Sequence, residues 1–204
     1  MSAGGISRRN FVSALPLTLL ATPSLASPLL GAEGPANPPF REGQKPGFIG
    51  PYSEEEETAV AASPMAQKIA TLHGKGYPCS EMILLAGLRV FELPEDHLDA
   101  AAVFGGGAGK RDLCGLLTGG LMAIGFAAGE KYEDRGVVHQ TGRQASNAYW
   151  EWWLSRGDLH CMGPGTEHDD APTFLRMTQR TALKLEEVMG VLIDGGYEVA
   201  ATTG

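Results

Sequence analysis

Cysteine is scarce in this sequence: its 204 residues contain three, Cys79, Cys114 and Cys161. No two of them are close enough for a C-x-x-C element, which excludes a local metal knuckle of that kind. A C-x-x-C-H element is also missing, and this excludes covalent haem attachment. Positive charge is outnumbered, with 16 Lys and Arg against 24 Asp and Glu. The formal net charge is −8 and no basic stripe occurs, so we expect no nucleic-acid partner.

The alternation of polar and apolar residues that marks β-strands is lacking too, whereas apolar residues recur at helical spacing from residue 64 onward. The predicted helices cover residues 64–73, 78–93, 94–104, 112–129, 136–155 and 171–193. Asp112 is the predicted N-cap of the fourth, and Asp169 or Asp170 that of the sixth. The predicted fold is all-α: a compact bundle of about five or six helices.

The fourth predicted helix is almost entirely apolar and small. Its glycines Gly115, Gly119, Gly125 and Gly129 are spaced for close helix contacts, and the segment is too short to span a membrane. We therefore expect a buried, glycine-rich central helix.

The N-terminus is typical of an export signal. Arg8 and Arg9 precede a short, weakly apolar run, and small residues before Ser27 predict cleavage after residue 26. The arginine pair favours the twin-arginine pathway over ordinary secretion, and so a location in the bacterial periplasm or at the outer face of the membrane. No transmembrane span is expected after cleavage. Residues 27–63 are rich in proline and glycine and predict an extended linker or surface wrap. Phe40, Phe48, Ile49 and Tyr52 of this segment could pack on the helical domain of residues 64–204 or on a second subunit.

The glycine-rich loop "FGGGAGKR" at residues 104–111 resembles a phosphate-binding loop only superficially. The first glycine of a Walker-type loop would fall on Phe104, and its Ser or Thr would fall on Arg111. The last glycine of a dinucleotide fingerprint would fall on Lys110, and no strand is predicted before the loop. We therefore expect no nucleotide cofactor.

The thiols are the stronger indication of chemistry. Cys79 and Cys114 are each predicted at a helix start, where the helix dipole would lower the thiol pKa. Cys161 follows His160 in a Gly-Pro loop between the last two predicted helices. Two plainer interpretations stay open: cysteines buried as small apolar residues, or one disulfide with a spare thiol.

Three segments resemble the C_GCAxxG_C_C family of redox-active proteins: "GKGYPCSEMILLA", "FGGGAGKRDLCGLLTGGLMAIG" and "LHCMG". The resemblance covers residues 66–192. It implies a helical domain, a version of which occurs in split-Soret cytochromes with an iron–sulfur cluster. It therefore implies an iron–sulfur cluster or another thiolate-bound metal here, with Cys79, Cys114 and Cys161 as candidate ligands.

The family carries a fourth cysteine near the start of the last helix, where this chain reads "DDAPTFLRMTQRT". His168, His160 or Asp169 could supply a fourth ligand, or the position could stay open. The glycines Gly105, Gly106 and Gly107 would let main-chain N–H groups approach the sulfurs and raise a reduction potential. Lys110 and Arg111 would add positive charge beside Cys114, or simply lie in solvent.

Three hypotheses follow. The first is an exported electron-transfer protein with a cysteine-ligated centre and an unidentified redox partner. The second is a metal-free thiol–disulfide protein or sensor, in which Cys79 and Cys114 pair and Cys161 resolves. The third is a non-catalytic interaction module that uses the tryptophans of "YWEWWLS", and a homodimer is a further expectation. Whether the protein is an enzyme stays open, because no nucleophile-and-base or paired-carboxylate arrangement indicates a hydrolase.

Overall fold

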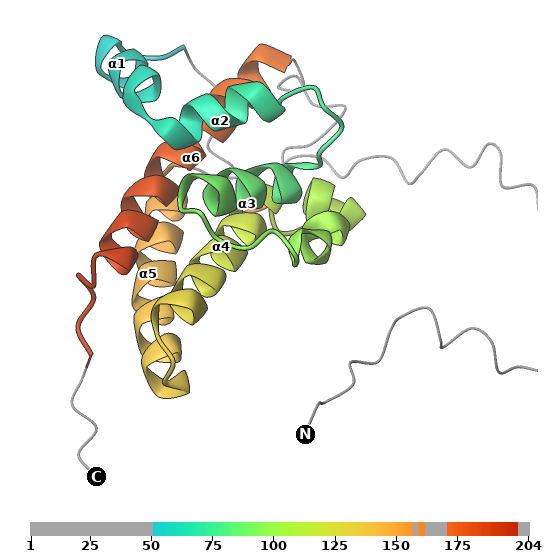
Figure 1. The fold of residues 1–204 in the computed structure, drawn as a ribbon. Coiled ribbons are helices and arrows are strands. Elements are labelled where there is room, and N and C mark those ends of the chain that lie inside the picture. Colours follow the sequence, from blue (N-terminus) through green and yellow to red (C-terminus); the bar gives the residue numbers. More distant parts are fainter. Residues whose placement is uncertain (1–50, 157–158, 162–170, 200–204) are drawn as a thin grey trace, which may run out of the picture. The chain divides into compact units, whose positions relative to one another are not determined.

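The computed structural model describes residues 51–156, 159–161 and 171–199, and Figure 1 shows how their helices are arranged. The elements are α1 (Glu54–Ala62), α2 (Pro64–Leu72), α3 (Cys79–Val90), η2 (Leu98–Phe104), η3 (Gly107–Arg111), α4 (Gly115–Lys131), α5 (Arg135–Arg156) and α6 (Ala171–Ile193). Within these ranges no strand forms, and an isolated antiparallel bridge joins Leu113 to His160. The all-α prediction is therefore confirmed.

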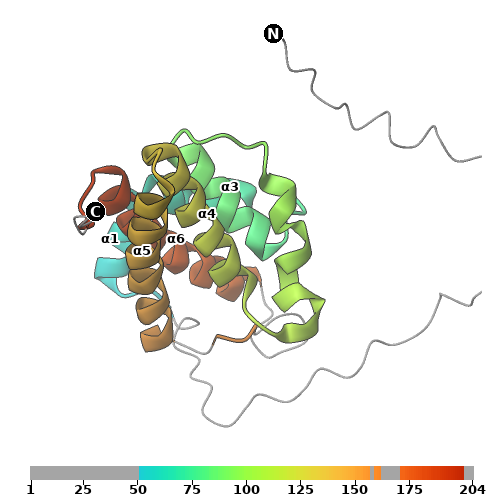
Figure 2. The same cartoon turned by 90° about the horizontal axis from the view of Figure 1, so that it is seen from below.

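Helix α4 lies at the centre of the bundle and contacts α3, α5, α6 and η2. Figures 1 and 2 both show α4 and α5 running side by side. The core between the helices is apolar: α6 turns the stripe of Leu185, Met189 and Leu192 inward, whereas α4 is apolar around most of its circumference. Its largest fully buried side chains include Trp153, Tyr149, Met65, Leu84 and Leu116. None of the helices in the described ranges has both the length and the apolar character needed to cross a membrane.

The helix ends follow local sequence chemistry in most places. α1 begins with a capping box, in which the Ser53 hydroxyl accepts the N–H of Glu56 and the Glu56 carboxylate accepts the N–H of Ser53. Ser63 caps α2, whose first residue is Pro64. The segment predicted as a helix over 94–104 instead forms a 3₁₀ helix, which begins only at Leu98.

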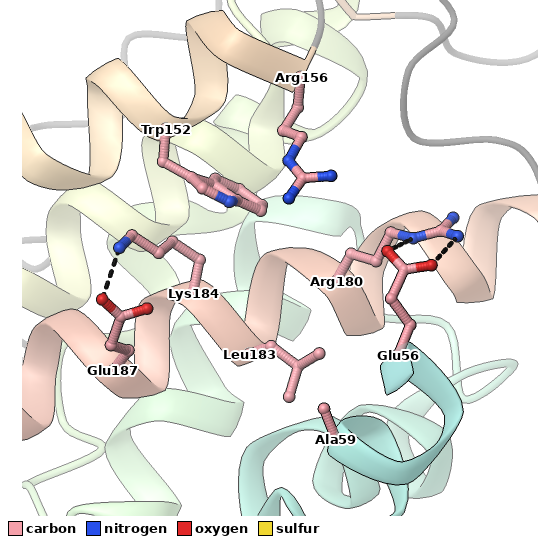
Figure 3. A pocket seen from close by; sticks show the side chains of 8 residues that line it. All are labelled: Glu56, Ala59, Trp152, Arg156, Arg180, Leu183, Lys184 and Glu187. Carbon is pink, nitrogen blue, oxygen red and sulfur yellow. Dashed lines mark hydrogen bonds and ion pairs between the residues drawn. The ribbon is translucent and has the colours of Figure 1, made fainter. Parts of the chain in front are cut away.

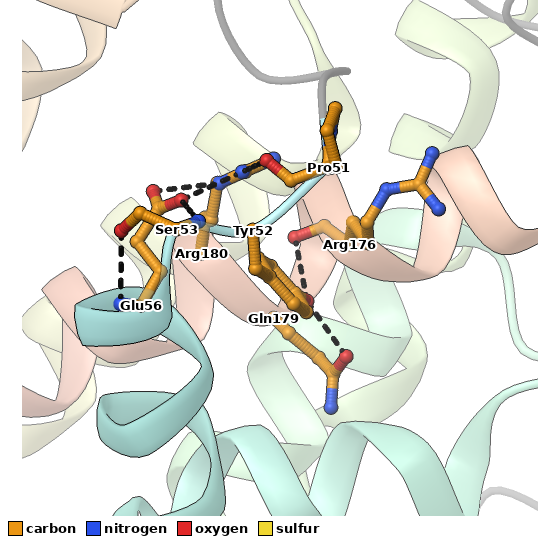
Figure 4. A network of polar contacts seen from close by, with 7 residues as sticks. All are labelled: Pro51, Tyr52, Ser53, Glu56, Arg176, Gln179 and Arg180. Atoms are coloured by element: carbon orange, nitrogen blue, oxygen red, sulfur yellow. Dashed lines mark hydrogen bonds and ion pairs between the residues drawn. The ribbon is translucent and has the colours of Figure 1, made fainter.

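The helical body begins at Glu54, before residue 64, because a polar network fastens this segment to α6 (Figure 4). The Arg180 guanidinium donates to both carboxylate oxygens of Glu56, at 2.9 and 2.8 Å, and to the Pro51 carbonyl at 2.9 Å. It also lies 4.7 Å from the centre of the Tyr52 ring, and the Tyr52 hydroxyl donates to Gln179 at 2.8 Å. The hydrogen bond from Arg180 lowers the pKa of Glu56 to about 2. The carboxylate therefore stays ionised, and the network intact, in all but strong acid.

The glycines of α4 differ along the helix. A Cβ on Gly119 would clash with the Ser80 carbonyl oxygen, so α3 and α4 touch through their backbones at this point. A Cβ on Gly125 or on Gly129 would meet no atom within 4 Å. The predicted close helix contacts are thus confirmed at Gly119 and wrong at Gly125 and Gly129, because these two glycines lie on the exposed face of α4, opposite the buried Ala123 and Ala127.

Candidate redox site

Cys79 is the first residue of α3 and follows Pro78, the N-cap of that helix. Its side chain lies half-buried against the first turn of α4. A Cβ on Gly115 would clash with the Cys79 sulfur, so glycine is the residue that lets α4 start directly beside this thiol. Main-chain N–H groups of Gly106 and Ser80 donate toward the same sulfur.

Cys114 and Cys161 are brought together by the antiparallel bridge between Leu113 and His160. The Cys114 N–H donates to the Leu159 carbonyl at 2.7 Å, and the Cys161 N–H donates to the Asp112 carbonyl at 2.8 Å. These two bonds hold the loop after α5 against the start of α4. The Cys114 and Cys161 thiols are themselves hydrogen-bonded. The structure contains no disulfide: all three cysteines are free thiols.

Asp112 is not the N-cap of α4, contrary to prediction. The helix begins two residues later, with Cys114 as the N-cap and no side-chain hydrogen bond at this end. The reason is tertiary, since Asp112 and Leu113 pair with the loop after α5 instead of entering the helix.

The glycine-rich loop next to Cys79 has an unusual backbone. Gly106, Gly107, Ala108 and Gly109 are consecutive residues with φ between 54° and 66°, and Arg111 has φ 57°. Left-handed conformations cost little at glycine but about 1 kcal/mol at other residues. This path brings the Gly106 N–H to the Cys79 sulfur, and Gly107 lies so close to Asp112 that a Cβ would be 2.6 Å from its nitrogen.

Gly105 has a separate role in placing the loop. A Cβ there would lie 2.5 Å from the Cβ of Pro78, directly before Cys79. Of the predicted contacts between this glycine run and a sulfur, the structure has the one from the Gly106 N–H to Cys79. Lys110 is exposed and Arg111 is half-buried at the end of η3.

The electrostatics of the thiols differ from the prediction. The hydrogen bond with Cys161, followed by burial and by the charge of Cys79, raises the pKa of Cys114 well above its usual value. Burial raises the pKa of Cys79 as well, and the N–H donors from Gly106 and Ser80 only partly oppose this. The expected lowering of both thiol pKa values is wrong, because desolvation and the neighbouring sulfurs outweigh the helix dipole.

Tyr149 of α5 belongs to the surroundings of the site and had no sequence prediction. It is fully buried, and its hydroxyl donates to the Leu116 carbonyl in the first turn of α4 at 3.0 Å. Burial and the nearby Cys114 raise its pKa well above the ordinary value. A Cβ on Gly120 would be 2.5 Å from the Tyr149 oxygen, so α4 needs a glycine where this ring packs against it. The glycine at position 120 was the one feature of the sequence that could have pointed to this contact.

The proposed fourth ligands divide into two groups. His160 lies next to Cys161, with its Nε2 atom 3.7 Å from a carboxylate oxygen of Asp112. His168 and Asp169 lie outside the described residues, as do Arg8 and Arg9 of the export signal.

The described part of the chain does not by itself fit a metal centre. It contains no group of three or more His, Cys, Asp or Glu side chains arranged to hold a metal ion. The sulfur arrangement instead fits chemistry between two protonated thiols, because Cys114 and Cys161 are already hydrogen-bonded and the pKa of Cys114 is raised.

Comparison with known families agrees with this cysteine framework. Residues 77–186, more than half of the chain, match the family described as "Putative redox-active protein (C_GCAxxG_C_C)". The chain belongs to this family. All three cysteines lie inside the matched segment, which extends from two residues before Cys79 into the middle of α6. No curated protein and no solved structure matches the chain.

Proposed function

We propose that this protein carries out thiol–disulfide exchange through Cys114 and Cys161, with Cys79 as a third thiol beside them. The observation that carries the proposal is the hydrogen bond between the Cys114 and Cys161 thiols at the start of α4. Two hydrogen-bonded thiols need little movement to form a disulfide. This pairing differs from the expected pairing of Cys79 with Cys114.

Exposure suggests the order of the steps. Cys161 is half-buried, whereas Cys114 is only 5% exposed. As a thiolate, Cys161 attacks a disulfide of a partner protein, forms a mixed disulfide and releases one partner sulfur as a thiolate. Cys114 then attacks the sulfur of Cys161 and releases the second partner sulfur. The protons of Cys114 and Cys161 end on the two partner thiols, so the partner gains two electrons and this protein gains one disulfide.

An iron–sulfur cluster or another thiolate-bound metal is a second candidate, and one observation favours it. The N–H groups of Gly106 and Ser80 donate toward the Cys79 sulfur, an arrangement that stabilises a thiolate ligand. In this candidate the further ligand comes from His168, His160 or Asp169.

The deciding experiment uses protein purified without oxygen, as the wild type and as Cys79→Ser, Cys114→Ser and Cys161→Ser. We expect a glutathione redox titration to remove two thiols reversibly, and mass spectrometry to map the disulfide to Cys114 and Cys161. Cys79→Ser is the matched control and should retain the disulfide, whereas both other variants should lose it.

Two results would contradict the thiol mechanism. Iron and sulfide, with a visible absorption band lost in all three variants, would establish the metal candidate. Metal-free protein whose thiols do not oxidise reversibly would remove both candidates and leave an interaction module.

We further propose export by the twin-arginine pathway, which suits a folded protein with reactive thiols. The support is the Arg8–Arg9 pair ahead of a weakly apolar run. Fractionation of cells that express the full chain should place it outside the cytoplasm. Arg8→Lys with Arg9→Lys should retain it inside, and export of that double variant would contradict the proposal.

A further inference from the structure

A groove runs along the seam between α4 and α5, away from the α4 N-terminus that holds the cysteines. Its volume is about 720 Å³. On the α5 side its floor follows Val138, Gly142, Ser146 and Trp150, which are four residues apart and so form one row along the helix. The row spans a little over three turns, or roughly 18 Å. An open groove of this length is suited to an extended occupant.

The floor is mostly apolar, and glycines form part of it. Leu121 and Gly125 line it from α4, opposite Gly142 and Trp150 of α5. A Cβ on Gly125 would meet no atom within 4 Å, and one on Gly142 would meet only the Cβ of Ala128, at 3.4 Å. The backbone of an incoming helix could therefore approach closely at both glycines.

The rim of the groove carries two cations, Arg135 and Arg143. Arg135, His139 and Arg143 lie at i, i+4 and i+8, in a second row of α5 parallel to the floor. Among the described residues no carboxylate lines the groove, although the chain has a net charge of −8. The adjacent carboxylate of Asp134 accepts the Val137 N–H at 2.9 Å and so caps α5.

A second hollow, between α1, α5 and α6, makes the contrast clear (Figure 3). Its volume is about 490 Å³, and two of its cations already have partners within it. Arg180 is paired with Glu56 at 2.8 Å, and Lys184 is paired with Glu187 at 2.7 Å. In the described part of the chain the α4–α5 groove offers Arg135 and Arg143 no acidic partner of this kind, and Arg135 lies 3.4 Å from the His139 ring nitrogen instead, so their charge can be satisfied from outside.

We propose that the α4–α5 groove binds an acidic amphipathic helix of a partner protein. The apolar face of that helix packs on Leu121 and Trp150 and crosses Gly125. Its carboxylates, spaced four residues apart, face Arg135 and Arg143. Helix-in-groove recognition combines an apolar face with anchors at this spacing, and the charge complementarity selects an acidic helix over a basic one.

Fluorescence anisotropy with a labelled synthetic helix tests the proposal on the full chain. The probe is a peptide of about 16 residues with glutamates four apart beside a leucine face, and its control carries lysines in place of the glutamates. We expect the acidic peptide to bind and the lysine peptide not to bind. Arg135→Ala with Arg143→Ala should weaken binding about tenfold or more. Gly125→Leu should abolish it by filling the floor. Lys75→Ala, an exposed cation outside the groove, should leave it unchanged.

Several outcomes would overturn the proposal. They are no binding of the acidic peptide, equal binding of both peptides, or unchanged binding in the double arginine variant. Binding to phosphatidylglycerol vesicles without peptide binding would assign the groove to an anionic membrane instead. A dimer in sedimentation that Gly125→Leu dissociates would assign it to a second copy of this chain. Circular dichroism separates loss of binding from loss of folding in each variant.

Discussion

The two halves of α4 use the same residue type in opposite ways. In the first half, Gly115 and Gly119 leave room for Cys79 and for the backbone of α3. In the second half, Gly125 and Gly129 are exposed and have no neighbour where a side chain would be. Glycine in a helix interior costs about 1 kcal/mol relative to alanine. In the first half close packing offsets that cost, and in the second half nothing within the described residues does.

The glycines of α4 therefore belong to two separate surfaces of the helix. The N-terminal half holds the thiols in a fixed arrangement, so a change there should alter both stability and thiol chemistry. In the C-terminal half Gly125 lines the α4–α5 groove, so a change there should alter binding without altering thiol chemistry. Substitutions at matched positions can separate these roles.

Gly119→Ala should have the largest effect. Its Cβ would clash with the Ser80 carbonyl oxygen and lie 2.6 Å from the Ile83 side chain, so α3 and α4 would have to move apart. We expect a loss of about 3 kcal/mol in the free energy of unfolding, measured by urea denaturation. An unchanged urea midpoint would show that α3 and α4 can move apart without cost. It would also remove the contrast between the two halves of α4.

Gly115→Ala should have a somewhat smaller effect on stability and a specific effect on the thiols. The added Cβ would clash with the Cys79 sulfur and lie 2.9 Å from the Phe104 carbonyl oxygen. We expect a loss of about 2 kcal/mol, since a side-chain sulfur can shift more easily than backbone. Alkylation of Cys79 with iodoacetamide should also become faster as the sulfur is displaced toward solvent. An unchanged rate would contradict the close placement.

Alkaline pH should destabilise the protein through the same end of α4. The pKa of Cys114 is raised above 9.0 in the folded state, so the native protein keeps a proton that the unfolded chain releases. Stability from this group is fully present below about pH 9 and falls as the pH rises further, by at most about 1.4 kcal/mol per pH unit. Urea denaturation at several pH values should show a shallower fall in Cys114→Ala, and equal slopes would contradict the raised pKa.

Gly125→Ala should have the smallest effect and the opposite sign. The site has open space for a Cβ and a helical backbone. We expect a gain of about 0.8 kcal/mol in the free energy of unfolding from helix propensity alone. Gly129→Ala, outside the lining of the groove, is the matched control and should behave alike. A loss of stability at either position would show that the glycine face of this half of α4 is packed after all.

Prediction from the sequence succeeded where interactions between nearby residues control the structure, and it failed where contacts between distant residues do. The predicted helix over 171–193 coincides with α6, and that over 136–155 lies within one residue of α5, because both carry long, regular patterns. At the start of α4 the prediction failed, since Asp112 pairs with the loop after α5. That pairing joins residues more than forty positions apart, so no local pattern indicates it.

The sequence by itself determined the helices and the identity of the three thiols, because helical periodicity and residue chemistry are local properties. Tertiary structure alone decided that Cys114 bonds to Cys161 and that the pKa of Cys114 rises, since both depend on what packs around the sulfur. It also decided which glycines of α4 are contacts and which form an open floor. The physical reason is that desolvation and close approach depend on neighbours distant in sequence, whereas helix formation depends mainly on residues within a few turns.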